Sequence, residues 1–418
     1  MNTVLDEFEI AAGWTELPFR AVARKVSESG FPDLESLSVF LDAGVVPRAS
    51  REDNHNQLGE SLEKYQRVLP NDLVFNKLRT WQGGFGISDY EGIVSPAYII
   101  ARPDRSLIEP RFLGYLLKSK PYLAELTRLS KWMPPTQFDI SWESIRDLKL
   151  RIPLLEEQRR IADFLEIQIE VINGIVANKK NQIRVNSEIV RTKLYESFLN
   201  NIDANGTYSL PYLDRMVHAH QQFGRIFDVS LGKMVQPEPK SESDVFVPYL
   251  NAASMSNLHE APDQKMWVAP GDFKSSLVES GDLLVVEGGD VGNSQFYFGE
   301  PVIIQNSLHR VRALPNSSLS YAHAVLELVK NSNYFSIICN GATIRHLTLE
   351  KLRGLQVPHF QKEIQEEIGT EYMKFRDSNG VLSNELTSAI ALLEEYKSAV
   401  ITGAVTGQFD VTTKRSVA

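Results

Sequence analysis

The chain has 418 residues, a formal net charge of −9 and a single cysteine, Cys339. This length predicts two to four domains, and one cysteine excludes an internal disulfide or a zinc site built from several cysteines of one chain. No apolar run approaches the ~18 residues of a membrane helix, and the acidic N-terminus lacks signal-peptide features. We therefore expect a cytoplasmic protein without membrane contact. The acidic balance argues against indiscriminate coating of phosphate, but it leaves local basic patches open.

The first 152 residues predict a mixed domain of strands and helices. Strands are predicted from Leu69 onward, where Val, Ile, Phe and Tyr lie between Gly and Pro breaks in DLVFNK and GIVSPAYIIARP. A helix with leucines on one face, broken at Pro121, is predicted for RFLGYLLKSKPYLAELTRLS. A short helical turn and a strand ending at Pro153 are predicted for ISWESIRDLKLRIP.

The longest predicted element begins after Pro153 and runs to about Leu199, without another proline until Pro211. Its apolar residues recur every seventh position, which keeps them on one side of a helix and predicts a partner helix, although any two-helix core would show the same spacing. Roughly 45 helical residues at about 1.5 Å each would form a rod on the order of 65 Å long. The pairing candidates are Leu165, Ile169, Ile172, Val176, Ile183 and Val190.

The same order of elements then recurs. Ile140–Leu148 matches Leu347–Leu355, 207 residues later, with three identical residues, and the same offset returns at Gln158 and Gln365. The pattern predicts a duplicated module, a globular domain followed by a long helix, and its period is far too long for a solenoid.

The second long helix is predicted from about Glu363 to Ala404, and it is the available partner of the first. A pseudo-two-fold relation between the modules would make the two helices antiparallel. An Asn-Gly pair lies inside each helix, at 173–174 and 379–380, and is a candidate bend because glycine weakens a helix interior by about 1 kcal/mol. The pairing candidates of this helix are Leu382, Leu386, Leu393 and Val400.

Three segments of the sequence, taken together, are specific enough to indicate a protein family. PLLEEQRRIADFL opens the first long helix, LLEEYKSAVITGAVTGQFDV ends the second, and DLVFNKLRTWQGGFGIS with GIVSPAYIIARP lies in the first domain. In these segments the chain resembles the specificity (S) subunits of Type I restriction-modification systems: two conserved regions and one common type of target recognition domain. The resemblance covers essentially the whole chain. It departs at HFQKEIQEEIG, where the family more usually has a proline-leucine-glutamate-glutamine opening.

The resemblance implies an α+β fold: two similar globular α/β target recognition domains, separated by two long antiparallel spacer helices and related by a pseudo-two-fold internal repeat. The expected boundaries are 1–152 and 206–358 for the domains, 153–205 for the first helix, and 359–418 for the second helix with its tail. Each domain would read one half of a bipartite site in double-stranded DNA, while the helices set the gap. Two similar domains on a rod independently predict two half-sites at a fixed separation.

The resemblance also implies partners. Two methyltransferase (M) subunits would dock on the helices and domains, and two motor-nuclease (R) subunits can join. The S subunit itself catalyses nothing, and we expect no cofactor and no metal.

The segment from Lys77 to Gly86 is the best candidate for DNA contact in the first domain. Its glycines allow close approach, Lys and Arg suit phosphates or guanine edges, and Gln can pair with adenine. The same residues also suit an ordinary hairpin with a solvated basic tip and a core tryptophan. The candidates of the first domain are Lys77, Arg79, Trp81, Gln82, Ser95, Tyr98, Lys131 and Gln137; those of the second are Asn293, Gln295, Asn306, His309, Arg310, Thr343 and Arg345.

Enzyme functions find little support in the sequence. It lacks the phosphate-binding pattern G-x-x-x-x-G-K-[ST] and the Asn-Pro-Pro-Tyr or Asp-Pro-Pro-Tyr tetrapeptide of amino-methyltransferases. Asp282, Glu287 and Asp290 are the nearest approach to a nuclease cluster, but they fit turn and loop carboxylates better. Two alternatives stay open. A protein-binding scaffold would lack salt-sensitive binding to duplex DNA, and a self-sufficient nuclease would cleave plasmid with magnesium.

Overall fold

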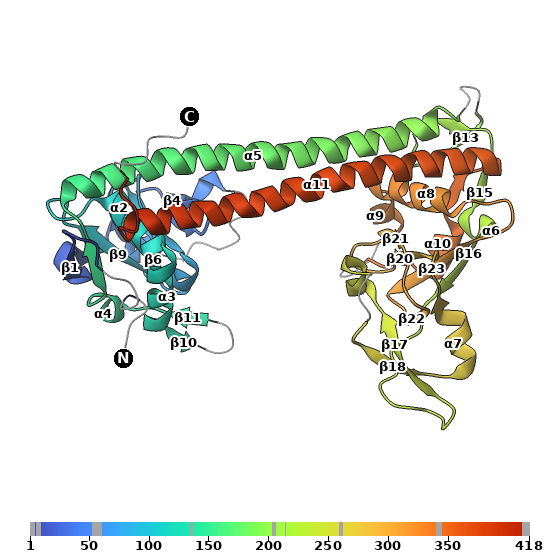
Figure 1. The fold of residues 1–418 in the computed structure, drawn as a ribbon, viewed down its shortest axis with the longest axis horizontal. Helices are drawn as coiled ribbons and strands as arrows, with labels where there is room; N and C mark the ends of the chain where they lie inside the picture. The colour runs from blue at the N-terminus through green and yellow to red at the C-terminus, as the bar shows by residue number, and fades with distance from the viewer. Residues whose placement is uncertain are drawn as a thin grey trace. The chain divides into compact units, whose positions relative to one another are not determined.

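The longest elements of the computed structural model are two helices, α5 (Leu155–Leu199) and α11 (Lys362–Val405) (Figure 1). The structure describes residues 5, 10–51, 61–133, 137–202, 206–213, 215–258, 262–339 and 345–411. The chain divides into two units, Met1–Lys179 with Ser388–Ala418, and Lys180–Thr387. Each long helix therefore contributes residues to both units. No helix within the described ranges is both long and apolar enough to span a membrane.

The first unit is built on an antiparallel sheet with strand order β2-β9-β6-β7. Side chains alternate between the faces of a strand, so Leu73 and Phe75 pack on one face against Phe112 and Leu116, while Val74 packs on the other face with Val39. The sheet is thus covered on both sides. Its strands are β2 (Ala23–Val26), β6 (Leu73–Asn76), β7 (Phe85–Ile87) and β9 (Tyr98–Pro103).

Helices cover one face of this sheet and short strand pairs cover the other. The helices are α1 (Phe19–Val22), α2 (Pro110–Lys118), α3 (Lys120–Leu129) and α4 (Trp142–Ile145). The strand pairs on the other face are β3 (Leu37–Phe40) with β4 (Gly44–Pro47) and β5 (Gln66–Val68) with β8 (Gly92–Val94). The pair of β1 (Thr15–Pro18) with β12 (Lys149–Ile152) belongs to the core on the helix side, and β10 (Lys131–Met133) pairs with β11 (Gln137–Asp139).

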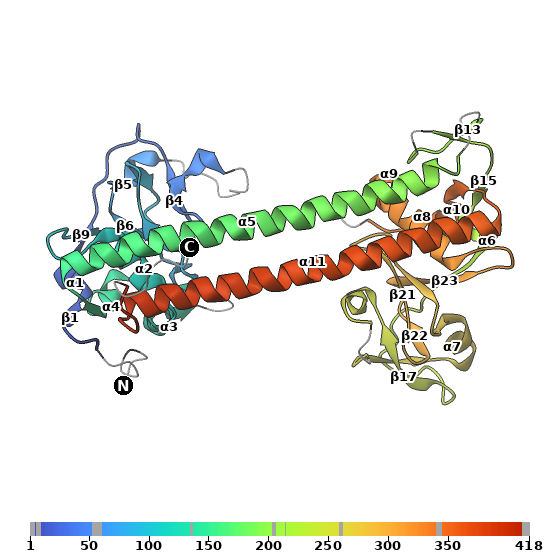
Figure 2. The same ribbon diagram turned by 45° about the horizontal axis from the view of Figure 1, so that its top comes forward.

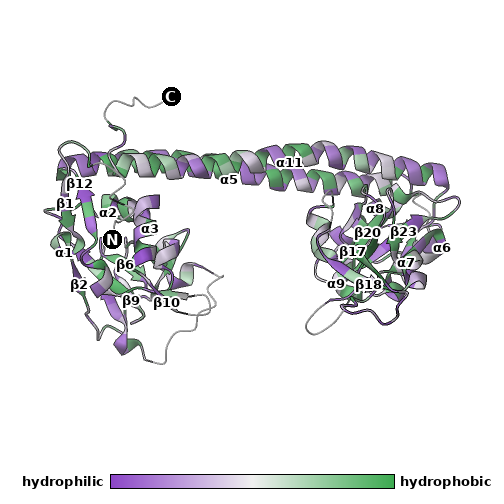
Figure 3. Ribbon diagram, turned by 60° about the horizontal axis from the view of Figure 1, so that its bottom comes forward, coloured by the Kyte–Doolittle hydropathy of each residue, from purple (hydrophilic) through white to green (hydrophobic). Residues whose placement is uncertain are grey.

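The second unit repeats this sheet in the order β16-β23-β20-β21 and adds a second sheet in the order β18-β17-β22-β19. The first sheet contains β16 (Phe227–Leu231), β20 (Leu283–Val286), β21 (Ser294–Phe296) and β23 (Leu308–Ala313). The second contains β17 (Val245–Leu250), β18 (Lys265–Val268), β19 (Leu277–Val278) and β22 (Val302–Ile304). Buried hydrophobic residues pack on both sheets, and strands such as β20 and β23 are coloured as hydrophobic in Figure 3.

Among the remaining elements of the second unit, one strand pair has a clear counterpart in the first. The β15–β24 pair is the counterpart of β1–β12: β24 is followed by α11, just as β12 is followed by α5. The remaining elements are β13 (Tyr208–Ser209), β14 (Met216–Val217), β15 (His220–Gln222), β24 (Gln356–Pro358), α6 (Phe223–Ile226), α7 (Pro270–Ser276), α8 (Leu319–Asn331), α9 (Tyr334–Ile338) and α10 (Leu349–Gly354). The two copies, the mixed sheet and helix content and the two long helices confirm the predicted fold class.

An ion pair between a buried aspartate and a partly buried arginine occurs in both copies. Nε and Nη2 of Arg102 donate to the Asp72 carboxylate at 2.8 Å, and the same atoms of Arg312 donate to Asp282 at 2.5 and 2.7 Å. Each aspartate also accepts from the backbone N–H three residues before it. Because two parallel bonds fix both partners in one plane, the pair holds the same two strands together in each domain.

A buried glutamine attaches each long helix to its domain. Gln158 Oε1 accepts from the Glu109 N–H at 2.9 Å, and Gln365 Oε1 accepts from the Ser318 N–H at 3.0 Å. The amide nitrogen of each donates to the carbonyl five residues earlier in the chain. Replacing either side chain would leave buried polar groups unpaired, which explains why this residue recurs at the sequence offset.

The long helices pair within each unit, where they run side by side (Figure 2). In the first unit the beginning of α5 packs with the end of α11, and in the second unit the end of α5 packs with the beginning of α11, so the helices are antiparallel. Lys397 Nζ donates to Asn173 Oδ1 at 3.1 Å, and Asn186 Nδ2 donates to Asn379 O and Ser383 Oγ at 2.9 Å. Both Asn-Gly pairs lie inside continuous helix, so neither interrupts it.

The predicted pairing residues differ in burial. One departs from the expected seam: Leu382 is 45% exposed, since the neighbouring Ser383 faces α5 and meets the buried Asn186. The inward position is therefore polar here, and the expectation for Leu382 is corrected. Leu165, Ile172, Val176, Leu386 and Val400 are buried, and Ile169, Ile183, Val190 and Leu393 are partly buried.

Candidate nucleic-acid interface

The loop between β6 and β7 is held by its own backbone. Gly83 N donates to Thr80 O at 2.9 Å, which closes a turn of 3-10 helix, and the buried Thr80 hydroxyl donates to Asn76 O at 2.7 Å. Gly83 follows with φ of 86°, a conformation that favours glycine. A Cβ on Gly84 would lie only 2.7 Å from Arg79 O, so the chain can turn here only without a side chain. This turn leaves Arg79 and Gln82 exposed.

Three aromatic side chains extend from this loop to the surface. Trp81 packs on Phe138 with ring centroids 5.1 Å apart, and Phe138 packs on Trp132 at 4.9 Å. Trp132, in the strand pair β10–β11, is 49% exposed. The strand pair is joined to the loop because Ile140 N donates to Lys77 O at 3.2 Å.

These residues create one surface on the first domain, which we name the first loop surface: Lys77, Arg79, Gln82, Lys131 and Trp132. Cations attract phosphate, and an exposed indole ring can contact bases. This combination suits a nucleic acid. In the sequence, Trp132 lies in the same candidate loop as Lys131 and Gln137, and its exposure depends on the strand pair that carries it.

Within the first loop surface, Lys77 is less accessible than Arg79: it is partly buried, and Nζ donates to Pro96 O at 3.4 Å. The candidates outside this surface are less accessible too. Ser95 Oγ accepts from the backbone N–H two residues later and so supports its own turn. Burial raises the pKa of Tyr98, which packs against the core. The side chain of Gln137 and all of Thr343 lie outside the described residues.

The second domain carries different chemistry at the same place. Leu347 N donates to Glu287 O at 2.7 Å, as Ile140 N donates to Lys77 O in the first domain. Both acceptors immediately follow the corresponding strands β20 and β6. Glu287 is therefore the structural counterpart of Lys77, and a carboxylate stands where the first domain has a cation.

The carboxylates considered for nuclease chemistry each have a separate partner. Asp282 binds Arg312, Glu287 Oε2 lies 2.8 Å from His346 Nδ1, and Asp290 lies 2.9 Å from Lys330 Nζ. This pairing supports their interpretation as turn and loop carboxylates. Among the residues that the structure describes, no cluster of three or more His, Cys, Asp or Glu side chains is arranged to hold a metal ion.

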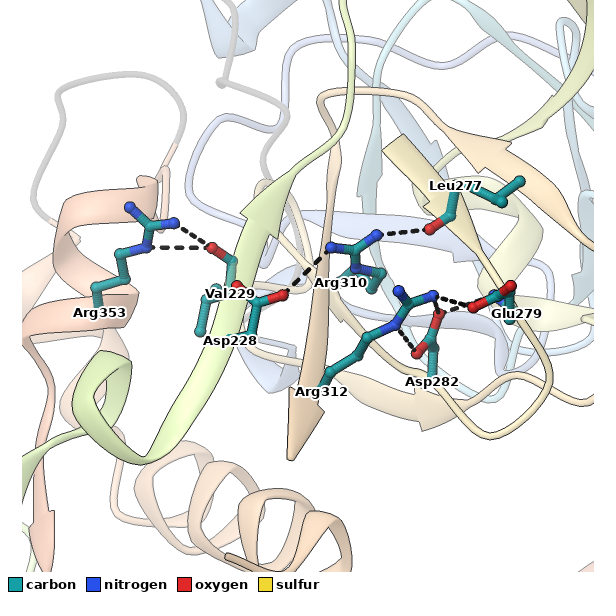
Figure 4. A network of polar contacts seen from close by, with 8 residues as sticks. All are labelled: Asp228, Val229, Leu277, Glu279, Asp282, Arg310, Arg312 and Arg353. Atoms are coloured by element: carbon teal, nitrogen blue, oxygen red, sulfur yellow. Dashed lines mark hydrogen bonds and ion pairs between the residues drawn. The ribbon is translucent and has the colours of Figure 1, made fainter. Parts of the chain in front are cut away.

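His309 and Arg310 do not face outward, contrary to expectation. His309 is fully buried and Nε2 lies 2.6 Å from Leu347 O, and burial lowers its pKa. Arg310 Nη1 donates to Leu277 O at 2.7 Å, and Nη2 lies 3.4 Å from Asp228 (Figure 4). Both side chains are covered by their own domain, so the expected DNA-contacting set is corrected at these positions.

The remaining second-domain candidates are accessible in part. Asn306 is partly buried and Arg345 is exposed. Asn293 and Gln295 line a cavity of about 800 Å³ between β21, α8 and the parts of the long helices that belong to this unit.

A buried histidine, missed in the sequence, also lines this cavity. His323 Nδ1 lies 2.8 Å from Ser294 Oγ, and Arg376 donates to Nε2. Burial, aided by the Arg376 charge, lowers the pKa of His323 to about 3. Burial also raises the pKa of Glu327 nearby. The only sequence signal was a histidine inside the apolar helix YAHAVLEL.

Two copies of one sheet-and-helix module, each with an exposed polar loop and joined by paired helices, define a duplicated recognition scaffold. The chain belongs to the family of the Type I restriction modification DNA specificity domain, whose family model matches residues 31–185 and 222–387.

Solved structures have the same fold. A chain from a study of complex assembly and conformational transition of the type I R-M system matches with a TM-score of 0.69 and 16% identity, covering 96% of this chain and all of that one. The HsdS subunit from Thermoanaerobacter tengcongensis matches with a TM-score of 0.50 and 16% identity, covering 97% of this chain and all of that one. At such identities the likeness shows the fold alone.

Proposed function

We propose that this chain is the DNA-binding specificity subunit of a Type I restriction-modification complex, and that each domain reads one half of a bipartite target. The observation that carries the proposal is the difference at equivalent positions, Lys77 in one domain and Glu287 in the other. A donor and an acceptor suit different base edges. One backbone with two loop chemistries is therefore suited to two different half-sites.

The proposed DNA contacts come from the exposed and partly buried candidates. In the first domain the exposed cations would bind phosphate or guanine edges and Gln82 would pair with adenine. In the second domain Asn293, Gln295, Asn306 and Arg345 supply amides and one cation. We propose residues 1–152 and 206–358 as the target recognition domains, with 153–205 and 359–418 forming the spacer helices and tail.

The outer face of the helices supports a docking role. Ile167, Val171 and Ile175 follow each other at four-residue spacing along α5, and they are 61%, 55% and 41% exposed. This spacing puts them on one helix face. On α11, Leu392 and Tyr396 are exposed in the same unit. We propose that methyltransferase subunits cover these apolar side chains, that motor-nuclease subunits can join them, and that catalysis resides in those partners.

The test is adenine methylation in cells that carry this chain with its methyltransferase partner. Long-read sequencing should reveal one new bipartite motif. A verified complex that produces no motif would refute the proposal. Binding to duplex DNA that falls steeply with salt, as phosphate neutralisation requires, separates this function from a protein-binding scaffold.

A further inference from the structure

In the second domain, the exposed His346 is held in a fixed orientation. The His346 side chain is 52% exposed, whereas that of its partner Glu287 is only 16% exposed. His346 pairs with Gly288 in an isolated antiparallel bridge. Its backbone position is thus set by the loop that follows β20.

The imidazole ring lies against the glycine. A Cβ on Gly288 would come within 3.3 Å of Nδ1 and 3.4 Å of Cε1 of His346, closer than side chains normally pack. The absence of a side chain at this position therefore gives the ring its place. Glu287 then holds the ring from one side, with Oε2 at 2.8 Å from Nδ1.

This contact determines which nitrogen carries the proton. An ionised carboxylate can only accept a hydrogen bond, so Nδ1–H must be the donor. In the neutral ring Nε2 then keeps its lone pair and is an acceptor. Nε2 of His346 has no hydrogen-bond partner among the described residues.

An exposed acceptor at this position has a defined complement in DNA. In the major groove, only adenine N6 and cytosine N4 offer amino donors. Arg345 is exposed beside it and can bind a phosphate. In the first domain the counterpart of Glu287 is Lys77, a donor, which would instead seek acceptors on guanine or the backbone.

We propose that His346 is a specificity-determining residue of the second domain, with Nε2 accepting a hydrogen bond from the exocyclic amino group of an adenine or cytosine. Glu287 is the positioning residue that fixes the ring. The inference rests on the proposed function, because it requires that this domain bind a DNA half-site. The identity of the affected base pair distinguishes adenine from cytosine.

The experiment compares methylation motifs of complete complexes that contain single variants. His346→Ala and His346→Phe should both relax one base pair of one half-site, with discrimination there reduced roughly ten-fold. Phe keeps a ring over Gly288 and removes only the nitrogens. Glu287→Gln should keep the wild-type motif because its amide oxygen can still accept from Nδ1–H, while Glu287→Ala should relax the same base pair as His346→Ala.

The matched control is His359→Ala. His359 is also exposed, with Nδ1 2.8 Å from Gln221 Nε2, but it follows β24 rather than the β20 loop. It should leave both half-sites unchanged. An intact complex should still bind duplex DNA in a salt-dependent way and should still methylate motifs with the unchanged other half-site.

Three results would overturn the inference: a wild-type motif in His346→Phe, relaxation spread over both half-sites, or Glu287→Gln behaving like Glu287→Ala. If His346→Ala abolishes methylation through misfolding, the motif of the His346→Phe complex decides whether the inference holds. Failure of the wild-type complex to produce any bipartite motif would instead refute the proposed function. The two failures are therefore distinguishable.

Discussion

At the scale of single residues, burial separates supporting side chains from accessible ones. The side chains of His309 and Arg310, on β23, are buried within their own domain. The side chain of His323 is also buried, with Arg376 of α11 bonded to it, whereas the side chain of His346 is exposed. All four are polar residues. Their roles differ because a buried polar group must satisfy its hydrogen bonds inside the protein, while an exposed one keeps them for a ligand.

The buried His323 predicts a loss of stability in acid. Its pKa is about 3 in the folded state and near 6.5 when unfolded. Between these values the unfolded chain binds a proton that the folded ring does not, so stability falls as pH drops below 6.5. We expect about 2 kcal/mol less free energy of unfolding at pH 5 than at pH 7 from this group.

Urea unfolding at both pH values measures this contribution. His323→Gln should remove it, because the amide does not titrate. His359→Gln, a change at an exposed histidine, should retain the wild-type pH dependence. Equal pH dependence in wild type and His323→Gln would contradict the expectation.

At the scale of elements, the two long helices have an inner and an outer face. The inner face holds the buried leucines, isoleucines and valines together with Asn186, which bonds to α11 through Asn379 and Ser383. A buried asparagine in a helical seam favours one register over its neighbours. The outer face carries apolar side chains that the described structure leaves uncovered.

Charges on that outer face should block docking. Ile167→Asp combined with Val171→Asp should weaken binding of the methyltransferase subunit by at least about ten-fold, because burying an unpaired carboxylate is costly. Stability of the isolated chain should change little, since both side chains are exposed. Ala177→Asp adds a charge at an exposed position two residues after Ile175, on a different face of the same helix, and serves as the control. Calorimetric titration that gives equal affinities would exclude this docking face.

A matched lengthening of both helices should widen the DNA gap. Seven residues inserted after Lys179 in α5 and after Thr387 in α11 preserve the apolar repeat, and they add about 10 Å, or roughly three base pairs. Both half-sites should stay the same. Methylome sequencing measures the gap. An insertion in α5 alone should break the seam and abolish assembly, whereas altered half-sites with an unchanged gap would count against the spacer role.

At the scale of the whole molecule, DNA recognition has to be local. The chain carries a net charge of −9, which repels DNA at long range. Binding therefore depends on small groups of cations such as Lys77 and Arg79 in the first loop surface. A duplicated module allows such groups to change in one domain while the other keeps its own chemistry.

Removing those cations should weaken binding of the complex to duplex DNA. Lys77→Ala with Arg79→Ala is expected to lower affinity by about ten-fold or more and to reduce the salt slope by up to about 2, because fewer counterions are released. The second half-site should remain unchanged. Arg160→Ala with Arg184→Ala removes two cations paired with glutamates on α5 and should have little effect. Equal salt slopes in the two double variants would show that the first loop surface does not bind phosphate.

The duplication, both long helices and the order of elements were predictable from the sequence. They depend on repeated apolar spacing and on recurring residues such as Gln158 and Gln365, which are properties of short stretches of chain. The inner face of α11 presents Ser383 where the seven-residue repeat predicted Leu382, which shows the limit of this reasoning. Where a polar pair such as Asn186 and Ser383 bonds between the helices, a seven-residue repeat can misplace the inward-facing residue by one position.

By itself, the amino-acid sequence determined that this protein is one module used twice, because helical periodicity and turn residues act locally. Only the tertiary structure decided which polar residues remain accessible, because burial depends on segments distant in the chain. It placed Glu287 at the position of Lys77 through backbone bonds from Leu347 and Ile140. It also set the His346 ring against Gly288, a contact that joins residues 58 positions apart.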